Sequence, residues 1–364
     1  MRSGTARWVC VIWSAENSAA AAVIPVVDVA PLLGTACAAR ALADETLFAA
    51  ARDIGFVCIR GLPPEVPLGP AARARLLTIF TLTDSDRRRL YRRKFAPQNP
   101  NVYRGWFPVQ PGNLTAKEGI DLGADVAYGS GVTLRGDPLR EPSPLPEEHR
   151  VPGWRAAVAA YYRAMEQLAA ALMRSLARSL GLSAGYFDAA FRHGLSTLRL
   201  IRYPPRSAAE LAAVTDPAVW VDAPAAGRYL VGAPHTDSGF VTLLAQDAVA
   251  GLQARARDGR WTDVPPLEET LVVNFGQVLE HWSAGRIRAT EHRVLGTGAE
   301  RYSIPFFYEA RADATIAPLP IDSPDRFAPF EYGDFLWKRI TSFVEFRGME
   351  AERTPVTTDR REKR

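Results

Sequence analysis

Long apolar runs and cysteines are scarce in this sequence of 364 residues. No run of about 18 apolar residues occurs, so the sequence predicts no transmembrane helix. The three cysteines all lie in the first sixth of the chain, without the spacing of a metal site or a disulfide framework. We therefore expect a protein of a reducing compartment, the cytoplasm.

A large excess of charge of one sign is also missing. The formal net charge is +4, and the basic residues gather in local runs such as residues 86–94 and the C-terminal RREKR. Nucleic-acid binding needs a broad basic patch on a recognisable module, and the sequence contains no such module. We therefore predict no nucleic-acid or membrane partner, and the sequence leaves the oligomeric state open.

Core-forming residues are present in the usual amount. The chain is 47% hydrophobic and 23% charged, which predicts a globular protein with a sizeable core. Residues 1–23 mimic a signal peptide, but polar residues break their apolar patch, so we predict a disordered extension. The catalytic unit is predicted to comprise a helical and β region at 24–150 and a core at 151–347, before a disordered tail at 348–364.

The periodicity of the second half predicts its fold. Apolar residues recur every three or four positions from Trp154 to Leu180, which is typical of one long amphipathic helix. Seven short β-type runs with mostly short connections follow between residues 197 and 309, before a final helix at 332–346. The pattern predicts a mainly β fold with α-helices, a double-stranded β-helix (jelly-roll) core with helices packed on one face.

Residues 96–153 differ in texture from the rest of the chain. They are rich in proline and glycine and follow a predicted helix at 71–95, so we interpret them as a long functional loop. Within this loop, residues 101–128 are a candidate lid over a small-molecule substrate. The predicted substrate contacts are aromatic: Tyr103, Trp106 and Phe107 in the lid, and Phe306 in a later strand.

His235 and Asp237 lie at the end of a predicted strand at 229–237. Side chains two apart on a strand project from the same face, with Cα atoms about 6.6 Å apart, so one ion can contact both. Two imidazoles and one carboxylate that leave coordination positions open are the ligand set of non-haem Fe(II) oxygenases. The pattern therefore predicts a metal site that needs one further histidine.

The chain has five histidines, so the choice of that second imidazole is narrow. His149 and His193 lie in a loop and at a helix end, far from the predicted strands. His281, in a predicted helical turn, and His292, in a predicted strand at 286–294, remain as candidates. A partly buried structural histidine is the simpler interpretation of His281.

A predicted hairpin favours His292 as the ligand. The turn at residues 296–299 returns the chain into a strand that carries Arg301 and Ser303. In a hairpin centred on this turn, His292 lies opposite Ser303, and these functional side chains point to one face. The hairpin would also place a guanidinium and a hydroxyl one ligand's length from the metal.

Arg301 and Ser303 match the needs of a dicarboxylic 2-oxo acid. A guanidinium fork with a neighbouring hydroxyl suits the distal carboxylate of such an acid, whose other end chelates iron. An arginine inside the core without a partner would be a costly buried charge. The simpler alternative is an outward Arg301 that pairs with Glu300 or Glu309.

With these residues in view, the sequence resembles the isopenicillin N synthase-like branch of the Fe(II)/2-oxoglutarate-dependent dioxygenases. The resemblance runs from residue 24 to about residue 346, and three segments carry it: HTDSGFVTLLAQD (235–247), VNFGQVLEHWSAGRIRATEHRV (273–294) and RYSIPFFYE (301–309). It implies that iron is held by His235, Asp237 and His292. It implies contacts to 2-oxoglutarate from Arg301, Ser303 and Tyr203.

Two positions depart from the pattern of many members. Many members have an asparagine two residues before the tyrosine, where this chain has Ile201. Part of the contact to the cosubstrate is therefore missing or replaced. Many members have a Gly-Asp pair after the VN strand, where this chain has Gly276 and Gln277. We expect this change to be tolerated.

The resemblance implies that Fe(II), 2-oxoglutarate and O2 act together to oxidise a C–H bond of a small organic metabolite, by hydroxylation, desaturation or ring formation. A role in secondary metabolism, such as antibiotic biosynthesis, would fit that branch. An oxidase of the same family that needs no 2-oxo acid stays an alternative, because such relatives keep the Arg-x-Ser pair. A catalytically idle jelly-roll binding module and a zinc hydrolase are the alternatives from other classes.

Overall fold

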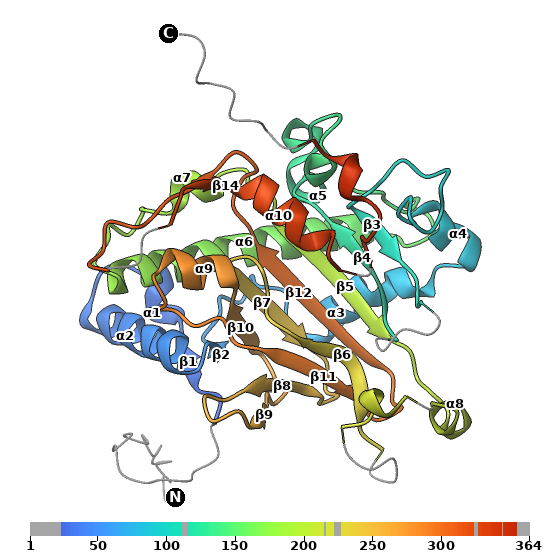
Figure 1. The fold of residues 1–364 in the computed structure, drawn as a ribbon, viewed down its shortest axis with the longest axis horizontal. Helices are drawn as coiled ribbons and strands as arrows, with labels where there is room; N and C mark the ends of the chain where they lie inside the picture. Colours follow the sequence, from blue (N-terminus) through green and yellow to red (C-terminus); the bar gives the residue numbers. More distant parts are fainter. Residues whose placement is uncertain are drawn as a thin grey trace, which may run out of the picture.

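The computed structural model describes residues 23–110, 116–214, 216–221, 227–323, 327–343 and 345–354. Apart from Val23, the extension predicted over residues 1–23 lies outside this part of the chain. No helix among the described residues is long and apolar enough to span a bilayer. Figure 1 shows the helices and strands in one body, with the strands gathered in its centre.

The larger of two facing sheets has eight strands within the described residues, all antiparallel to their neighbours except the parallel pair of β1 and β2. β-branched and aromatic residues dominate its central strands, as expected for strands buried on both faces. In spatial order the strands are Val26–Asp28 (β1), Phe56–Arg60 (β2), Leu271–Phe275 (β10), Val241–Gln246 (β7), Arg301–Tyr308 (β12), Thr197–Tyr203 (β5), Glu118–Leu122 (β4) and Gly105–Phe107 (β3).

The smaller sheet has four strands in the described residues, and an apolar layer joins it to the larger one. Tyr203 and Val272 of the large sheet share this layer with Val231 and Val294 of the small sheet. Two sheets packed face to face confirm the predicted jelly-roll core. In order, the small sheet contains Tyr229–His235 (β6), His292–Gly296 (β11), Leu252–Arg255 (β8) and Trp261–Asp263 (β9), and Thr315–Ile316 (β13) pairs separately with Phe330–Glu331 (β14).

The long helix Trp154–Ser179 (α6) packs against the face of the large sheet that is turned away from the small sheet. Its buried side chains repeat every three or four positions, and Leu198 and Leu200 of β5 meet them in one apolar core. Figure 1 shows α6 crossing the strands, with α2 beside it. The structure thus confirms the helix predicted from Trp154.

The other helices are shorter. Their bounds are Ala30–Leu33 (α1), Ala38–Asp53 (α2), Pro70–Leu77 (α3), Asp84–Arg89 (α4), Asp125–Tyr128 (α5), Asp188–Phe191 (α7), Ala208–Ala212 (α8), Gln277–Trp282 (α9) and Tyr332–Ile340 (α10). Single 3-10 turns lie at Thr78–Thr81, Ser130–Val132, Pro138–Arg140, Pro217–Val219 and Glu350–Glu352.

The candidate lid at residues 101–128 is wrong. Its two short strands, β3 and β4, form the edge of the large sheet beside β5, and residues 101–107 are buried. Two of its acids are paired with arginines of β5: Asp121 with Arg199, and Glu118 with Arg202. These two acids therefore belong to ion pairs whose partners lie far away in the sequence.

Two predicted boundaries also need correction. The helix predicted at 71–95 is interrupted, because Leu82 is extended and the Thr83 side chain caps a new helix by accepting a hydrogen bond from the Asp86 amide. The tail predicted from residue 348 begins too early, since Arg353 is buried and pairs with Asp137 and Asp334. Residues 355–364 of that tail lie outside the described part.

Candidate active site

His235, Asp237 and His292 meet at one end of the small sheet. His235 ends β6 and His292 begins β11, and the two histidines are direct partners in the antiparallel ladder. Their Nε2 atoms each lie 3.8 Å from Oδ1 of Asp237. One donor atom from each of the three residues lies within 4.8 Å of the others, so a single ion can contact all three.

Backbone carbonyls set the orientation of both imidazoles. Nδ1 of His235 is 2.8 Å from the Ala233 oxygen, and Nδ1 of His292 is 3.1 Å from the Thr290 oxygen. A carbonyl oxygen only accepts hydrogen bonds, so each Nδ1 carries the proton and each Nε2 keeps its lone pair. Burial, together with the neighbouring His292, lowers the pKa of His235 to about 4, which favours the neutral ring that a metal requires.

The two oxygens of the Asp237 carboxylate have different partners: Oδ2 is hydrogen-bonded, and Oδ1 faces the two histidines. Oδ2 accepts hydrogen bonds from Thr242 Oγ1 at 2.6 Å and from Asn274 Nδ2 at 2.7 Å. Burial acts to raise the pKa of Asp237, but the two imidazoles and these hydrogen bonds outweigh it and hold the pKa below its ordinary value. The donor set is therefore a fixed anion and two neutral nitrogens, which fits a divalent first-row ion.

His292 joins the cluster for a reason other than the predicted hairpin. β11 pairs with β6 and β8 in the small sheet, whereas β12 lies in the large sheet between β5 and β7. The turn at 296–299 therefore crosses from one sheet to the other, and the predicted hairpin opposite Ser303 is wrong. His281 is exposed on α9 and contacts Phe327 with tilted rings whose centroids lie 4.1 Å apart, and it is not part of the cluster.

Arg301 lies in the interior with an incomplete set of partners. It is 3% exposed, and Nε and Nη2 donate to the Val249 oxygen and to Gln246 Oε1 at 3.2 and 3.3 Å. Its Nη1 is buried without a hydrogen-bond partner among the described residues. A buried guanidinium nitrogen without a partner fits an anionic ligand such as the distal carboxylate of 2-oxoglutarate.

Ser303 and Tyr203 flank this guanidinium. Ser303 is buried two positions along β12, on the same face as Arg301. Tyr203 is the cross-strand partner of Arg301, whose guanidinium carbon lies 5.0 Å from the centre of the tyrosine ring. Ile201 packs into the apolar layer between the sheets. Gln277 accepts a hydrogen bond from Arg339 at 2.8 Å, so it has a structural partner.

Comparison with known proteins agrees with this geometry. The 2OG-Fe(II) oxygenase superfamily matches residues 196–310 of the chain. Isopenicillin N synthase of Streptomyces clavuligerus is 30% identical over 332 residues, which cover 89% of this chain and 97% of that protein. The chain belongs to the 2OG-Fe(II) oxygenase superfamily.

Two further relatives extend this result. The oxygenase is 29% identical over 311 residues to the 2-oxoglutarate-Fe(II) type oxidoreductase hxnY of Emericella nidulans, covering 81% of this chain and 82% of that protein. It shares its fold with a full-length Neurospora crassa protein solved in complex with alpha-KG, at a TM-score of 0.73 and 22% identity over 88% and 96% of the two chains. The chain is thus an oxidoreductase of the Fe(II) and 2-oxoglutarate type, and its His-Asp-His cluster is capable of binding iron.

A cavity of about 370 Å³ opens beside His235 and Asp237 in this oxygenase. Part of its wall is apolar and comes from the large sheet, α10 and the segment that follows: Phe240, Phe307, Leu336, Ile340, Phe343 and Phe346. The polar part comes chiefly from β5 and the chain around β4 and β12: Lys117, Thr197, Arg199, Glu309 and Glu345. Such a mixture suits a small molecule with an apolar body and a few polar groups.

Of the four aromatic residues predicted to contact substrate, Tyr103 alone lines this cavity. Trp106 is fully buried and packs on Phe80, with ring centroids 5.4 Å apart. Phe107 is buried beneath Arg199, and Phe306 packs on Tyr162 of α6 at 5.0 Å. These three predicted contacts are wrong: Trp106 and Phe107 belong to a sheet edge rather than a lid, and Phe306 points to the helical face of β12.

The alternation along the strands could have identified residues that the sequence analysis missed. Thr197 and Arg199 share a face of β5 with Tyr203, and Phe307 and Glu309 continue the β12 face of Arg301. Glu309 is buried, and the Tyr332 hydroxyl donates a hydrogen bond to its carboxylate. Burial raises the pKa of Glu309 to about 8, so the side chain is protonated at neutral pH.

Proposed function

We propose that this protein is a dioxygenase that couples 2-oxoglutarate to the oxidation of a C–H bond in a small organic molecule. In this proposal His235, Asp237 and His292 hold Fe(II). Arg301 and Ser303 hold the distal carboxylate of 2-oxoglutarate, with Tyr203 against the same guanidinium. A place in secondary metabolism and a cytoplasmic location stay predictions from the sequence.

One observation carries the proposal: two Nε2 lone pairs and one free carboxylate oxygen converge beside a cavity. The unpartnered Nη1 of the buried Arg301 supports the second half of the assignment. A zinc hydrolase would leave that arginine unexplained. An idle binding module would have no use for the converging donors.

When bound, Fe(II) with 2-oxoglutarate activates O2, and the 2-oxo acid leaves as succinate and CO2. The residues of the chain orient the metal ligands and limit the access of water to the substrate. Thr242 and Asn274 fix the plane of the Asp237 carboxylate, and the carbonyls of Ala233 and Thr290 fix the two rings. The apolar part of the cavity wall limits the water beside the substrate and orients the C–H bond that reacts.

Iron binding tests the ligand assignment. Anaerobic wild-type protein should bind one Fe(II) per chain, His292→Ala should lose the ion, and His281→Ala, the matched histidine on α9, should retain it. The measurement is a titration with Fe(II) followed by iron analysis of the desalted protein. The opposite result for the two histidines would reject the assignment.

The 2-oxoglutarate dependence is tested against the oxidase alternative, which the similarity to isopenicillin N synthase keeps open. With Fe(II), O2 and 2-oxoglutarate alone, the wild type should slowly release succinate above the background of His292→Ala. Oxygen consumption should require the 2-oxo acid. Full-rate oxygen consumption with a substrate in the absence of any 2-oxo acid would favour the oxidase.

A further inference from the structure

Arg199 lines the cavity and keeps one guanidinium nitrogen outside its ion pair. Its Nε and Nη2 donate to the two carboxylate oxygens of Asp121 at 2.6 and 2.8 Å, and its guanidinium lies between the rings of Phe107 and Phe307. These contacts fix the side chain, which stays 20% exposed on the cavity wall. Nη1 makes no hydrogen bond to any described residue. A fixed donor without a partner therefore points to a ligand.

The acid that pairs with Arg199 is shared with a second arginine. Asp121 is fully buried and also accepts a hydrogen bond from Arg92, which is fully buried as well. One carboxylate thus faces two guanidinium groups. Burial acts to raise the pKa of Asp121, but Arg199 and Arg92 outweigh it and hold the pKa below its ordinary value, so the acid is ionised.

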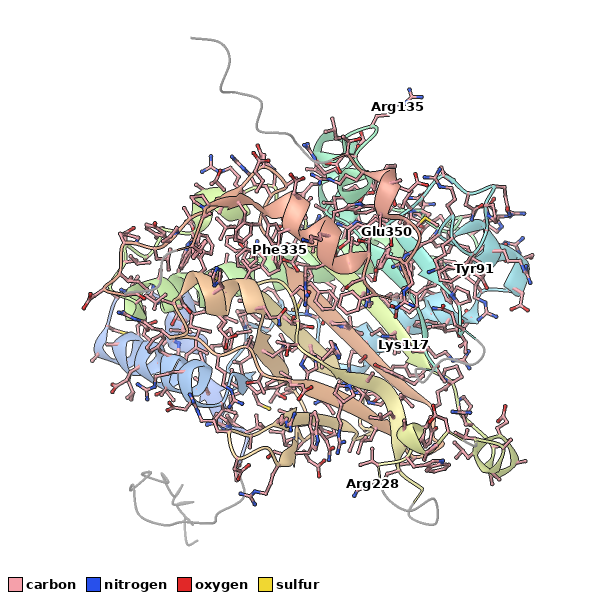
Figure 2. The ribbon with its side chains drawn as sticks, viewed as in Figure 1. Tyr91, Lys117, Arg135, Arg228, Phe335 and Glu350 are labelled. Atoms are coloured by element: carbon pink, nitrogen blue, oxygen red, sulfur yellow. The ribbon has the colours of Figure 1, made fainter. Side chains whose placement is uncertain are left out.

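Two more cations lie at the cavity wall or behind it. Lys117 is a residue of the cavity wall, and its Nζ lies 3.5 Å from a Glu345 oxygen. In Figure 2, Arg135 extends from the rim of the molecule, whereas Lys117 lies well inside its outline. Arg104 is buried behind the wall and donates to the wall residue Thr197, and no described carboxylate forms an ion pair with it.

The two cations of the cavity wall each have one carboxylate partner. Lys117 pairs with Glu345 and Arg199 pairs with Asp121. Arg104 belongs elsewhere, because it lines a second pocket together with Asp125 and Glu141. An ammonium has three donors and a guanidinium has five, so Lys117 and Arg199 keep donors for the carboxylate of a ligand.

The Arg301 site is separate from Arg199 and Lys117. Arg301 pairs across the sheet with Tyr203, whereas Arg199 lies four residues away along the same strand. Four residues of an extended strand span about 13 Å. Two anion sites thus lie on one face of the large sheet, and Arg199 is the one that opens into the cavity beside His235 and Asp237.

We propose that the cavity binds a small substrate that carries a single carboxylate, held by Arg199 Nη1 and Lys117, with its apolar body against Phe307, Leu336 and Ile340. The inference rests on the proposed function, because it takes the cavity beside the His-Asp-His cluster as the substrate site. A monoanion suits the site better than a phosphate, because both cations already face a carboxylate. The apolar part of the wall suits an aromatic or aliphatic acid over a sugar acid.

Binding of matched acid and amide probes tests the inference. Isothermal titration of anaerobic protein, loaded with Fe(II) and saturated with 2-oxoglutarate to fill the Arg301 site, compares phenylacetate with phenylacetamide and 3-phenylpropionate with its amide. Each acid should bind at least about tenfold more tightly than its amide, as expected for a charge-assisted hydrogen bond. Equal binding of acid and amide, or no binding of either acid, would overturn the inference.

Lys117→Gln should remove most of the preference for the acid, whereas Lys338→Gln, the same change at an exposed position of α10, should keep it. Arg199→Lys keeps the positive charge beside Asp121 but removes the guanidinium nitrogen Nη1. It should weaken the binding of the acids several-fold and leave the binding of the amides unchanged. If Lys117→Gln and Lys338→Gln behave alike, the inference is wrong.

Succinate release without any probe separates this inference from the proposed function. Release of succinate without a preference for acids would overturn the substrate class alone. A preference for acids without any turnover of 2-oxoglutarate would overturn the proposed function and leave the anion site in place.

Discussion

The end of the small sheet and the edge of the large sheet both bring charged side chains into the interior, by different means. At the small sheet, His235 and Asp237 lie two positions apart, and one ladder partner, His292, completes the group. At the edge of the large sheet, Asp121 is held by two arginines from other segments of the chain, Arg92 and Arg199. In the first arrangement the donor atoms stay free for a metal. In the second, most of the charged groups form ion pairs with one another.

The comparison separates residues that serve chemistry from residues that serve the fold. No hydrogen bond joins the three cluster side chains, and two of them, His235 and Asp237, line the cavity. The acid at the sheet edge makes bonds on both of its oxygens and has no exposed surface. Removal of a cluster residue should therefore affect activity first, and removal of Asp121 should affect stability first.

The strongest contrast is expected at Asp237. Asp237→Ala should lower iron-dependent succinate release by more than about a thousandfold, because the anionic ligand is lost. Stability should fall by only about 1 to 3 kcal/mol, the cost of the unpaired Thr242 and Asn274. Iron analysis, succinate release and thermal unfolding measure the three effects. Asp263→Ala on β9 is the control, and a variant of Asp237 that keeps iron and activity would contradict the assignment.

Asp121→Asn, at the edge of the large sheet, should lower stability. It leaves Arg92 and Arg199 buried around a neutral side chain, which should cost about 3 to 5 kcal/mol in the free energy of unfolding. Asp188→Asn is the matched control, because Asp188 pairs with Arg174 on the surface and should cost at most about 1 kcal/mol. Urea unfolding measures both. Equal losses would mean that the buried ion pairs do not stabilise the sheet edge.

Arg301 lies between these extremes, because it is buried like the sheet edge but has no carboxylate partner in the described part of the chain. Arg301→Ala should weaken 2-oxoglutarate by roughly tenfold to a few hundredfold, as expected for a charge-assisted pair of about 1.5 to 3 kcal/mol. Fe(II) affinity should stay nearly constant. The apparent affinity for 2-oxoglutarate in the succinate assay reports the effect, and an unchanged value would assign the carboxylate to another cation.

Glu309 should give the smallest effect, and one that depends on pH. Its pKa is raised by burial to about 8 in the folded protein, so the native state binds a proton that the unfolded state releases near its ordinary pKa. Stability therefore falls as pH rises between these two values. From about pH 5 to about pH 6, the wild type should lose about 1.4 kcal/mol more than Glu309→Gln does. Parallel curves from urea unfolding would show that Glu309 is ionised in the fold.

The same comparison explains what could be predicted from the sequence. The His235 and Asp237 pair and the Arg301 and Ser303 pair are local patterns on single strands, where a period of two fixes which side chains share a face. The jelly roll followed from the spacing of the β-type runs. These patterns required no knowledge of distant partners.

Membership of a sheet could not be predicted in the same way. Asp121 is stabilised by Arg199, a partner from a distant part of the chain, so its segment had the pattern of a polar loop. The turn at 296–299 gave no sign that it crosses between sheets, so the hairpin used to favour His292 was wrong, although His292 does lie in the cluster. Phe306 could have been excluded from the sequence, because the alternation that starts at Arg301 and Ser303 puts Phe307 on their face and Phe306 on the other.

The ladder between β6 and β11 has a consequence for how the protein acquires its metal. Backbone hydrogen bonds hold His235 opposite His292, so the entropy of bringing the two rings together is lost during folding rather than on metal capture. This arrangement differs from that of a zinc finger, whose metal builds its own site. A chelator should strip the ion and leave the tertiary structure standing, so that enzyme made under iron starvation can be reactivated by the metal alone.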